Sequence, residues 1–195
     1  NHTFDTANAD FIDDFLLVGG DLDTDNDLAA DQAVELADDA RVTHVLDVRL
    51  EANDSALWAQ LPEVHYLWNG MDDAGQAVPD DWWDSTTDWV VNAITSGGRV
   101  LIHCHMGINR SPSVAFAALL TLGWQPVDAM TAIRTARPVA NAWYAEQALA
   151  WHMNRTQTPP ALATRAHQHL ATWRRDHPLD VTRIIKDVRD RNNDW

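Results

Sequence analysis

The chain has 195 residues, of which 46% are apolar, and its 14 basic and 29 acidic side chains give a formal net charge of −15. This length and apolar content suit one domain with a full hydrophobic core and exclude a disordered chain. The negative charge argues against a protein that wraps nucleic acid or lies on anionic lipid, so neither nucleic acid nor a membrane is expected as a partner. No apolar run in the sequence approaches the ~20 residues of a transmembrane helix.

Acidic residues are concentrated in the first half of the chain. The sequence begins Asn1-His2-Thr3-Phe4, with neither an initiator methionine nor the apolar core of a signal peptide, so we expect a trimmed start and a cytoplasmic location. Residues 1–97 hold most of the acidic side chains but only two basic ones, Arg41 and Arg49. This excess is typical of a strongly solvated acidic face.

Short apolar runs bounded by turn residues predict buried strands in the first half of the chain. These runs are residues 15–18, 42–48 and 64–68. A helix is expected over residues 27–40, with Asp27 as its N-cap. A second helix is expected over residues 81–96, ended by Gly97-Gly98.

The second half predicts one more strand and a series of helices. Residues 99–103 are apolar on both faces, as in a central parallel strand. Helices are expected over residues 110–122, 126–136 and 141–155. Because strands and helices alternate along the chain, we predict an α/β fold with a mostly parallel central sheet flanked by helices.

The Pro159-Pro160 pair marks the boundary of a C-terminal extension. Residues 1–158 form the expected main domain, and residues 159–195 a helical extension packed on or beside it. Within the extension, apolar residues recur at helical spacing, at Leu162, Ala166, Leu170 and Trp173. The basic residues Arg174-Arg175 and those from Arg183 to Arg191 are expected to lie on a solvated helix face.

The segment after the strand 99–103 combines the only cysteine with a tight turn. It reads His103-Cys104-His105-Met106-Gly107-Ile108-Asn109-Arg110-Ser111. A short turn that contains glycine can point several backbone N–H groups into one concavity, and the dipole of the following helix adds to the attraction for an anion of phosphate size. The same field favours the thiolate form of a cysteine. A single cysteine excludes an internal disulfide and a cysteine-based zinc cluster.

The polar residues of this segment complete a candidate site for phosphate chemistry. The guanidinium of Arg110 can bind two phosphate oxygens at once, and Ser111 offers a hydroxyl to the sulfur. A Cys104 thiolate beneath a bound phosphate can attack phosphorus in line. We therefore predict a phosphate-binding loop, with His103 holding it by hydrogen bonds. The loop residues are His105, Met106, Gly107, Ile108, Asn109 and Arg110.

The pattern Cys-x5-Arg, with glycine three residues after the cysteine and serine after the arginine, resembles the signature of the cysteine-dependent protein tyrosine phosphatases. Over about residues 12–152 the chain is most similar to their small dual-specificity branch. Residues 15–19 resemble the first strand of that family, and residues 43–48 resemble its strand of the type ITHVLNV. The segment Ala136-Arg137-Pro138, followed by Asn141 and Gln147, resembles the region after the loop helix, where Asn141 is expected to brace the loop.

The resemblance implies a phosphatase that needs no cofactor or metal and forms a phosphocysteine intermediate. Its substrates would be phosphoproteins, with phosphotyrosine first and phosphoserine or phosphothreonine second. It also implies a general acid on a loop that precedes the cysteine, where Asp72 and Asp73 stand. In the family a bulky aromatic often follows this acid at the start of the next helix, and Trp83 is placed to match Asp73. We therefore prefer Asp73, with Asp72 as the alternative.

Some residues depart from the dual-specificity pattern and leave alternatives open. Asn109 replaces the usual serine, and Gly-x-Asn-Arg resembles the RNA triphosphatases of capping enzymes, although Ser111-Pro112 replaces their Thr-Gly. The same chemistry on an RNA 5′ phosphate or a small phosphate ester is thus one alternative, and a catalytically weak phosphoprotein-binding module is another. The loop lacks lysine, which argues against an inositol phospholipid. The pairs His103/His105 and His167/His169 have no third ligand nearby, so no metal is expected.

Overall fold

A computed structural model describes residues 4–182 and 184–186 of the chain. The first three residues, and most of the basic run from Arg183 to Arg191, lie outside the described residues. Among the helices that are described, none is both long and apolar enough to cross a membrane.

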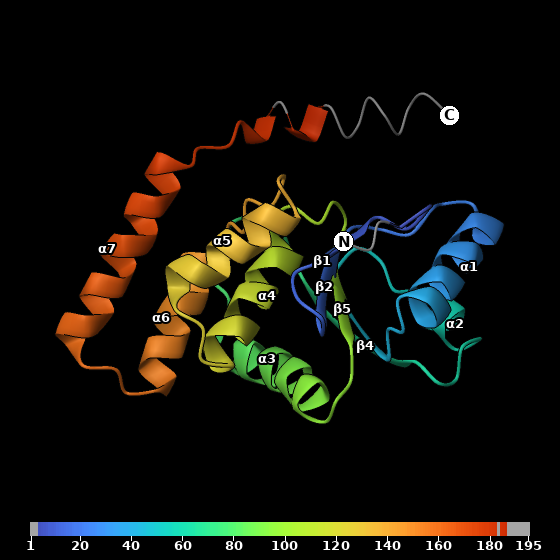
Figure 1. The fold of residues 1–195 in the computed structure, drawn as a ribbon, viewed down its shortest axis with the longest axis horizontal. Helices are drawn as coiled ribbons and strands as arrows, with labels where there is room; N and C mark the ends of the chain where they lie inside the picture. Colours follow the sequence, from blue (N-terminus) through green and yellow to red (C-terminus); the bar gives the residue numbers. More distant parts are fainter. Residues whose placement is uncertain (1–3, 183, 187–195) are drawn as a thin grey trace.

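Five strands form one central sheet in the order β1-β2-β5-β3-β4 (Figure 1). Four of them run parallel: β2 (Leu16–Gly19), β5 (Val100–His103), β3 (His44–Arg49) and β4 (His65–Met71). The edge strand β1 (Ala9–Phe11) pairs antiparallel with β2. The predicted α/β class with a mostly parallel sheet is therefore confirmed. Strand β1 was not predicted because three half-buried residues leave no apolar run to recognise.

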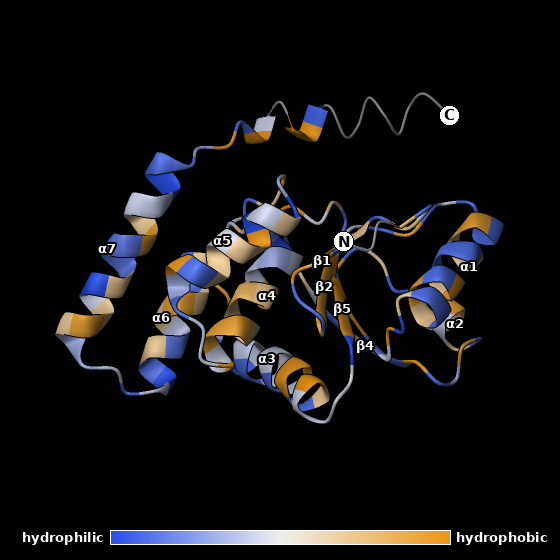
Figure 2. Ribbon diagram, in the orientation of Figure 1, coloured by the Kyte–Doolittle hydropathy of each residue, from blue (hydrophilic) through white to orange (hydrophobic). Residues whose placement is uncertain are grey.

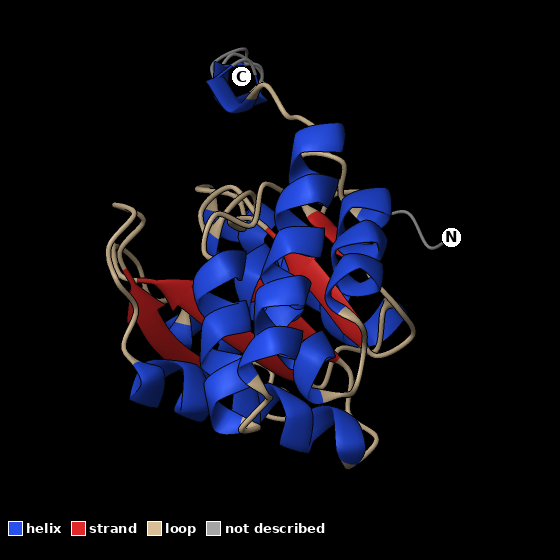
Figure 3. Ribbon diagram, turned by 90° about the vertical axis from the view of Figure 1, so that its left-hand side faces the viewer, coloured by secondary structure: helices blue, strands red, loops and turns tan. Residues whose placement is uncertain are grey.

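Helices cover both faces of this sheet (Figures 1 and 3). One face carries α3 (Asp80–Thr95), α4 (Arg110–Thr121), α5 (Pro126–Ala136) and α6 (Ala145–Arg155). The other carries α1 (Asn26–Val34), the π-helical turn η1 (Glu35–Asp39) and α2 (Ser55–Trp58). The predicted helices are present with ends that shift by a few residues.

Alternate residues of the strands divide the core into two clusters. On the central strand β5, Val100 and Ile102 pack in the cluster under α3 to α6, whereas Leu101 packs in the cluster under α1 and α2. The same division holds on β2, where Leu16 and Leu17 point to opposite faces. Successive side chains of a strand alternate between faces, so a strand that is apolar throughout must be covered on both sides. Figure 2 shows these strands as the most hydrophobic part of the molecule.

The first helix differs from its prediction at both ends. Its N-cap is Asp25, whose carboxylate accepts hydrogen bonds from the backbone N–H groups of Asp27 and Leu28, so the assignment of Asp27 was wrong. Several aspartates in this stretch are equally suitable caps by residue type, and only the turn of the backbone selects one. The helix then widens into η1, where Ala40 donates its N–H to the carbonyl of Glu35.

The C-terminal helix α7 (Pro160–Asp176) begins at the Pro159-Pro160 pair and packs on the main core through two side chains. Leu170 and Trp173 are buried and belong to the same cluster as the residues under α3 to α6. Most of the other residues of α7 are polar. The helix therefore shares its apolar face with the domain that it follows.

Leu170→Ala should destabilise the whole protein, because it leaves a cavity at a side chain that is 0% exposed. We expect the free energy of unfolding to fall by about 2–5 kcal/mol. Leu162→Ala, on the same helix but at a side chain that is 51% exposed, is the control and should change it by about 0.5 kcal/mol or less. Urea denaturation measures both. Equal, small effects would contradict a core shared between α7 and the rest of the chain.

Candidate active site

The sole cysteine lies where β5 ends and α4 begins, at the carboxyl edge of the sheet. Cys104 is buried, and its Sγ is 3.2 Å from Oγ of Ser111. The same Ser111 hydroxyl is 3.0 Å from the carbonyl oxygen of Gly19 on β2. Because a hydroxyl has a single proton, Ser111 donates either to Gly19 or to the sulfur. Turning this proton between the two partners lets Ser111 accommodate both a thiol and a thiolate.

The carbonyl groups of the 104–110 loop are bonded to groups outside it. The backbone N–H of Asp21 donates to the carbonyl of His105 over 2.9 Å. Arg137, which is buried, donates to the carbonyls of Met106 over 2.9 Å and of Gly107 over 2.7 Å. These bonds anchor the carbonyl groups of the loop from outside it. The nest of N–H donors itself stays a prediction from the sequence.

A second brace comes from the segment before α6. The backbone N–H groups of Asn141 and Ala142 both donate to the carbonyl of Ile108, over 2.8 and 2.9 Å. The side-chain amide of Asn141 donates to Oδ1 of Asn109 over 3.1 Å. These bonds also explain why α6 begins at Ala145 and not at Asn141: the backbone groups of this segment bond to the loop, and Ala142 takes a positive φ of 49°.

Arg110 is held in place by an acidic residue that the sequence analysis did not find. Its Nη1 and Nη2 donate to the two carboxylate oxygens of Glu51 over 2.7 and 2.6 Å, and Nη1 also donates to the carbonyl of Met71. The hydrogen bond from Arg110 lowers the pKa of Glu51 to about 2. Burial would lower the pKa of Arg110, but Glu51 and the nearby Cys104 and Asp73 raise it, so the guanidinium stays charged.

One donor of Arg110 is left for a ligand. Its Nε is buried and has no hydrogen-bond partner among the described residues, and it lies 3.9 Å from Oδ2 of Asp73.

Glu51 follows β3, and neighbouring parallel strands end at the same edge of the sheet. A carboxylate just after a strand next to the cysteine's strand was therefore the signal available in the sequence.

The two candidate acids point in different directions. Asp73 accepts a hydrogen bond from the side-chain amide of Asn109 over 3.3 Å, which aims its carboxylate at the loop. Its Oδ1 is also one of three acceptors within 3.3 Å of the hydroxyl oxygen of Tyr144, which has a single proton to donate. The carboxylate of Asp72 instead accepts the backbone N–H of its neighbour Asp73 over 2.8 Å. Burial raises the pKa of Tyr144, so this hydroxyl remains a donor.

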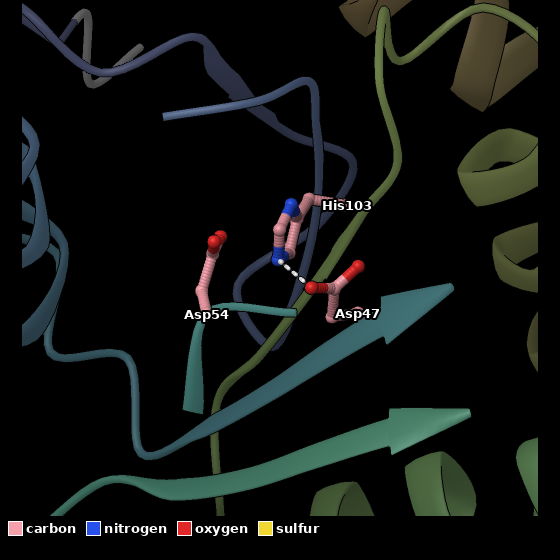
Figure 4. A group of neighbouring side chains, drawn as sticks. All are labelled: Asp47, Asp54 and His103. Atoms are coloured by element: carbon pink, nitrogen blue, oxygen red, sulfur yellow. Dashed lines mark ion pairs between the residues drawn. The ribbon is translucent and has the colours of Figure 1, made fainter. Parts of the chain in front are cut away.

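A buried ion-pair network lies behind the loop (Figure 4). Asp47, Asp54 and His103 each offer one atom within 4.8 Å of one another, the spacing of a metal site. The guanidinium of Arg49 donates to Asp47 and Asp54, and also to Asp21 over 2.7 Å. A cation of the chain itself therefore already bonds to these carboxylates and offsets part of their charge, so the group fits an arginine network better than a metal ion.

His103 differs from its expected role. Its ring nitrogens have no hydrogen-bond partner among the described residues, and the nearest carboxylate oxygen, on Asp47, is 3.8 Å from Nε2. The prediction that His103 holds the loop by hydrogen bonds is therefore wrong. Burial lowers the pKa of His103 and outweighs the attraction of Asp47, so the ring is neutral. It fills space beneath the loop between the sheet and the Arg49 network.

These groups meet around a small cavity of about 70 Å³. It brings together the predicted nucleophile, arginine, acid and most of the predicted loop, whereas Asp72 does not line it. Its last lining residue, Ile185, comes from the far end of the chain and was not predicted. The full lining is Asp73, Cys104, His105, Met106, Ile108, Asn109, Arg110 and Ile185.

A cysteine, an arginine and an aspartate around one cavity match the arrangement of the cysteine-dependent phosphatases. Residues 28–154 match the family described as dual specificity phosphatase, catalytic domain. The match covers more than half of the chain. The chain belongs to this family.

Curated relatives and solved structures agree with this assignment. The chain is 27% identical over 104 residues to mouse dual specificity protein phosphatase 15, covering 52% of this chain and 41% of that protein. It is 29% identical over 103 residues to mouse protein phosphatase Slingshot homolog 3, covering 51% of this chain and 15% of that one. The crystal structure of human DUSP28 aligns with a TM-score of 0.61 and 24% identity, over 76% of this chain and 95% of that chain, and supports the fold alone. The chain thus spans less than half the length of these curated relatives.

Gly107→Ala should disrupt the loop. Gly107 has φ of 66°, and a Cβ there would lie 2.4 Å from Nη2 of Arg137, which holds the loop carbonyls. Gly97→Ala is a matched control, since Gly97 has φ of 86° but nothing within 4 Å of a Cβ. Both variants should lose about 1 kcal/mol of stability from the backbone. Only Gly107→Ala should also abolish tungstate binding, measured by calorimetry. Equal binding by the two variants would contradict the role of Arg137.

Proposed function

We propose that this chain is a phosphatase that hydrolyses phosphomonoesters through a phosphocysteine intermediate, with protein phosphotyrosine as its main substrate and phosphoserine or phosphothreonine as a second. The observation that supports this most directly is the unpartnered Nε of Arg110, a residue that lines the same cavity as Cys104 and Asp73. A phosphoryl group in that cavity would meet a nucleophile, a cation and an acid at once.

The first step transfers the phosphoryl group to the sulfur. The Sγ of Cys104 attacks phosphorus, an S–P bond forms, and the P–O bond to the leaving group breaks. Asp73, protonated at this stage, gives its proton to the departing oxygen. The loop N–H donors and Arg110 bind the equatorial oxygens, where negative charge gathers in the transition state.

The second step releases phosphate. The ionised Asp73 takes a proton from a water molecule, whose oxygen attacks phosphorus as the S–P bond breaks. Ser111 then turns its hydroxyl from Gly19 toward the sulfur and stabilises the leaving thiolate, a movement that its contacts with both atoms allow. Glu51 keeps the guanidinium of Arg110 oriented throughout, because a bidentate pair leaves little freedom to rotate.

The size of the cavity favours a second candidate, hydrolysis of a small phosphate ester. Its volume of about 70 Å³ is well below the ~300–1,000 Å³ of ordinary ligand pockets. A small phosphate ester needs less of this space than a phosphotyrosine side chain does. Turnover of four substrates decides between the candidates: a phosphotyrosyl peptide, a phosphoseryl peptide, a small alkyl phosphate and triphosphate RNA.

A cytoplasmic location stays a prediction from the sequence.

Cys104→Ser should lose more than about 10³-fold in turnover, because a hydroxyl is not ionised at neutral pH while a thiolate is a strong nucleophile. Binding of a phosphate ester should persist, since the loop donors are unchanged. The assay is release of phosphate from an aryl phosphate in the presence of a chelator. Residual activity within tenfold of the unmodified chain would rule out the cysteine mechanism.

Asp73→Asn should slow turnover of esters with poor leaving groups by about 10²–10⁴-fold. An activated aryl phosphate should suffer less, because its leaving group needs little protonation. Asp72→Asn is the adjacent control and should leave both rates nearly unchanged, since its carboxylate bonds to the backbone of Asp73. Steady-state kinetics on a series of aryl phosphates tests this. The opposite ranking of the two variants would move the acid to Asp72.

A further inference from the structure

The segment that follows α7 returns to the active site. The described residues 178–182 and 184–186, here called the C-terminal strap, run back over the molecule from the end of that helix (Figure 1). The strap includes a short helical turn in which Ile184 donates its N–H to the carbonyl of Asp180 over 3.0 Å. Ile185 of the strap lines the same cavity as Cys104 and Arg110.

The point where the strap leaves α7 is firmly held. The ring of His177 stacks on Trp173 with 4.5 Å between centroids, and the backbone N–H of His177 donates to the Trp173 carbonyl over 3.0 Å. The guanidinium of Arg134 on α5 lies over the ring of Trp173, 5.1 Å from its centroid. Its Nη1 donates to the carbonyl of His177 over 3.1 Å. The strap therefore starts from a defined position on the core.

The same end of α7 is tied to the active-site loop. Arg174 donates to the carbonyls of Asn141 over 2.8 Å and of Ala142 over 2.6 Å. The N–H groups of those two residues donate in turn to the carbonyl of Ile108 in the loop. One hydrogen-bonded path thus links the base of the strap to the wall of the cavity, and it sets the direction in which the strap departs.

We propose that the C-terminal strap is a gate that closes the mouth of the cavity with Ile185. In the closed state the cavity admits an anion of phosphoryl size. A phosphotyrosine side chain on a protein enters only after the strap lifts. The identity of the substrate in this statement rests on the proposed function, whereas the closure itself rests on the position of Ile185.

The strap is suited to open because little of it is buried. Its described residues are half-buried or exposed, in contrast to Leu170 and Trp173 on α7, which belong to the core. Segments with few buried contacts open locally at low cost, independently of global unfolding. The strap is thus held at its base by the buried residues of α7, while its end, which carries the half-buried Ile185, can move.

Alkylation of Cys104 measures the gate without any turnover. Cys104 is the only cysteine of the chain, so the rate of thiol loss with iodoacetamide or with a bulky maleimide dye reports access to this one cavity. Ile185→Ala in the full chain should speed reaction with the dye about tenfold, as for a gate closed nine-tenths of the time. Iodoacetamide, being small, should react at nearly the same rate in both proteins. Ile184→Ala is the matched control and should behave like the unmodified chain.

A chain that ends at His177 keeps α7 and its anchor but lacks the strap. It should match Ile185→Ala with the dye and retain the melting temperature of the full chain. Equal dye rates for the full chain, Ile185→Ala and the shortened chain would overturn the proposal. So would an equal acceleration by Ile184→Ala, because that would show a general loosening and not removal of the Ile185 contact.

Turnover separates the gate from the proposed function. Ile185→Ala should raise kcat/KM for a phosphotyrosyl peptide about tenfold and leave the inhibition constant of inorganic phosphate unchanged. A lower kcat/KM would show that Ile185 helps to hold the substrate, and would overturn the gate. Failure of every variant to hydrolyse any phosphoester would refute the proposed function, and the alkylation rates would still decide whether the strap closes the cavity.

Discussion

The structure depends on one constraint, which is that each carbonyl of a tightly turned loop needs a partner once it is buried. The carbonyls of His105, Met106, Gly107 and Ile108 find theirs in the backbone of Asp21, in the side chain of Arg137 and in the backbone of Asn141 and Ala142. A buried carbonyl without a bond would cost about 1–3 kcal/mol. All of these partners lie outside the loop, so the loop's own N–H groups are not needed to satisfy its carbonyls. The proposed binding of phosphate therefore depends on how the back of the loop is bonded.

Some of the acidic residues in the first half of the chain form ion pairs with arginines near the active site. Asp47, Glu51 and Asp10 pair with Arg49, Arg110 and Arg137, three arginines that are nearly buried. Asp47 and Arg49 are buried on both sides of their pair, and breaking such a pair by removing a single partner costs about 3–5 kcal/mol. The interpretation of the acidic excess as a solvated face is therefore incomplete, because part of it holds the cations on which the loop and its arginine depend.

The C-terminal helix is joined both to the core and to the site. Leu170 and Trp173 pack in the main hydrophobic cluster, while Arg174 reaches the segment that braces the loop. Helix α7 therefore connects the main core to the segment that braces the active-site loop.

The sequence by itself determined the class of the fold and the centre of the site. The apolar strands, the alternation with helices and the spacing of Cys104, Gly107 and Arg110 depend on neighbours in the chain, and such local patterns can be read directly. Tertiary structure alone decided what lies far apart in sequence: the bidentate pairing of Glu51 with Arg110, the orientation of Asp73 by Asn109 and the arrival of Ile185 at the cavity. These contacts join segments tens of residues apart, and their geometry follows from how the sheet orders its strands and how the helices pack, which no local pattern records.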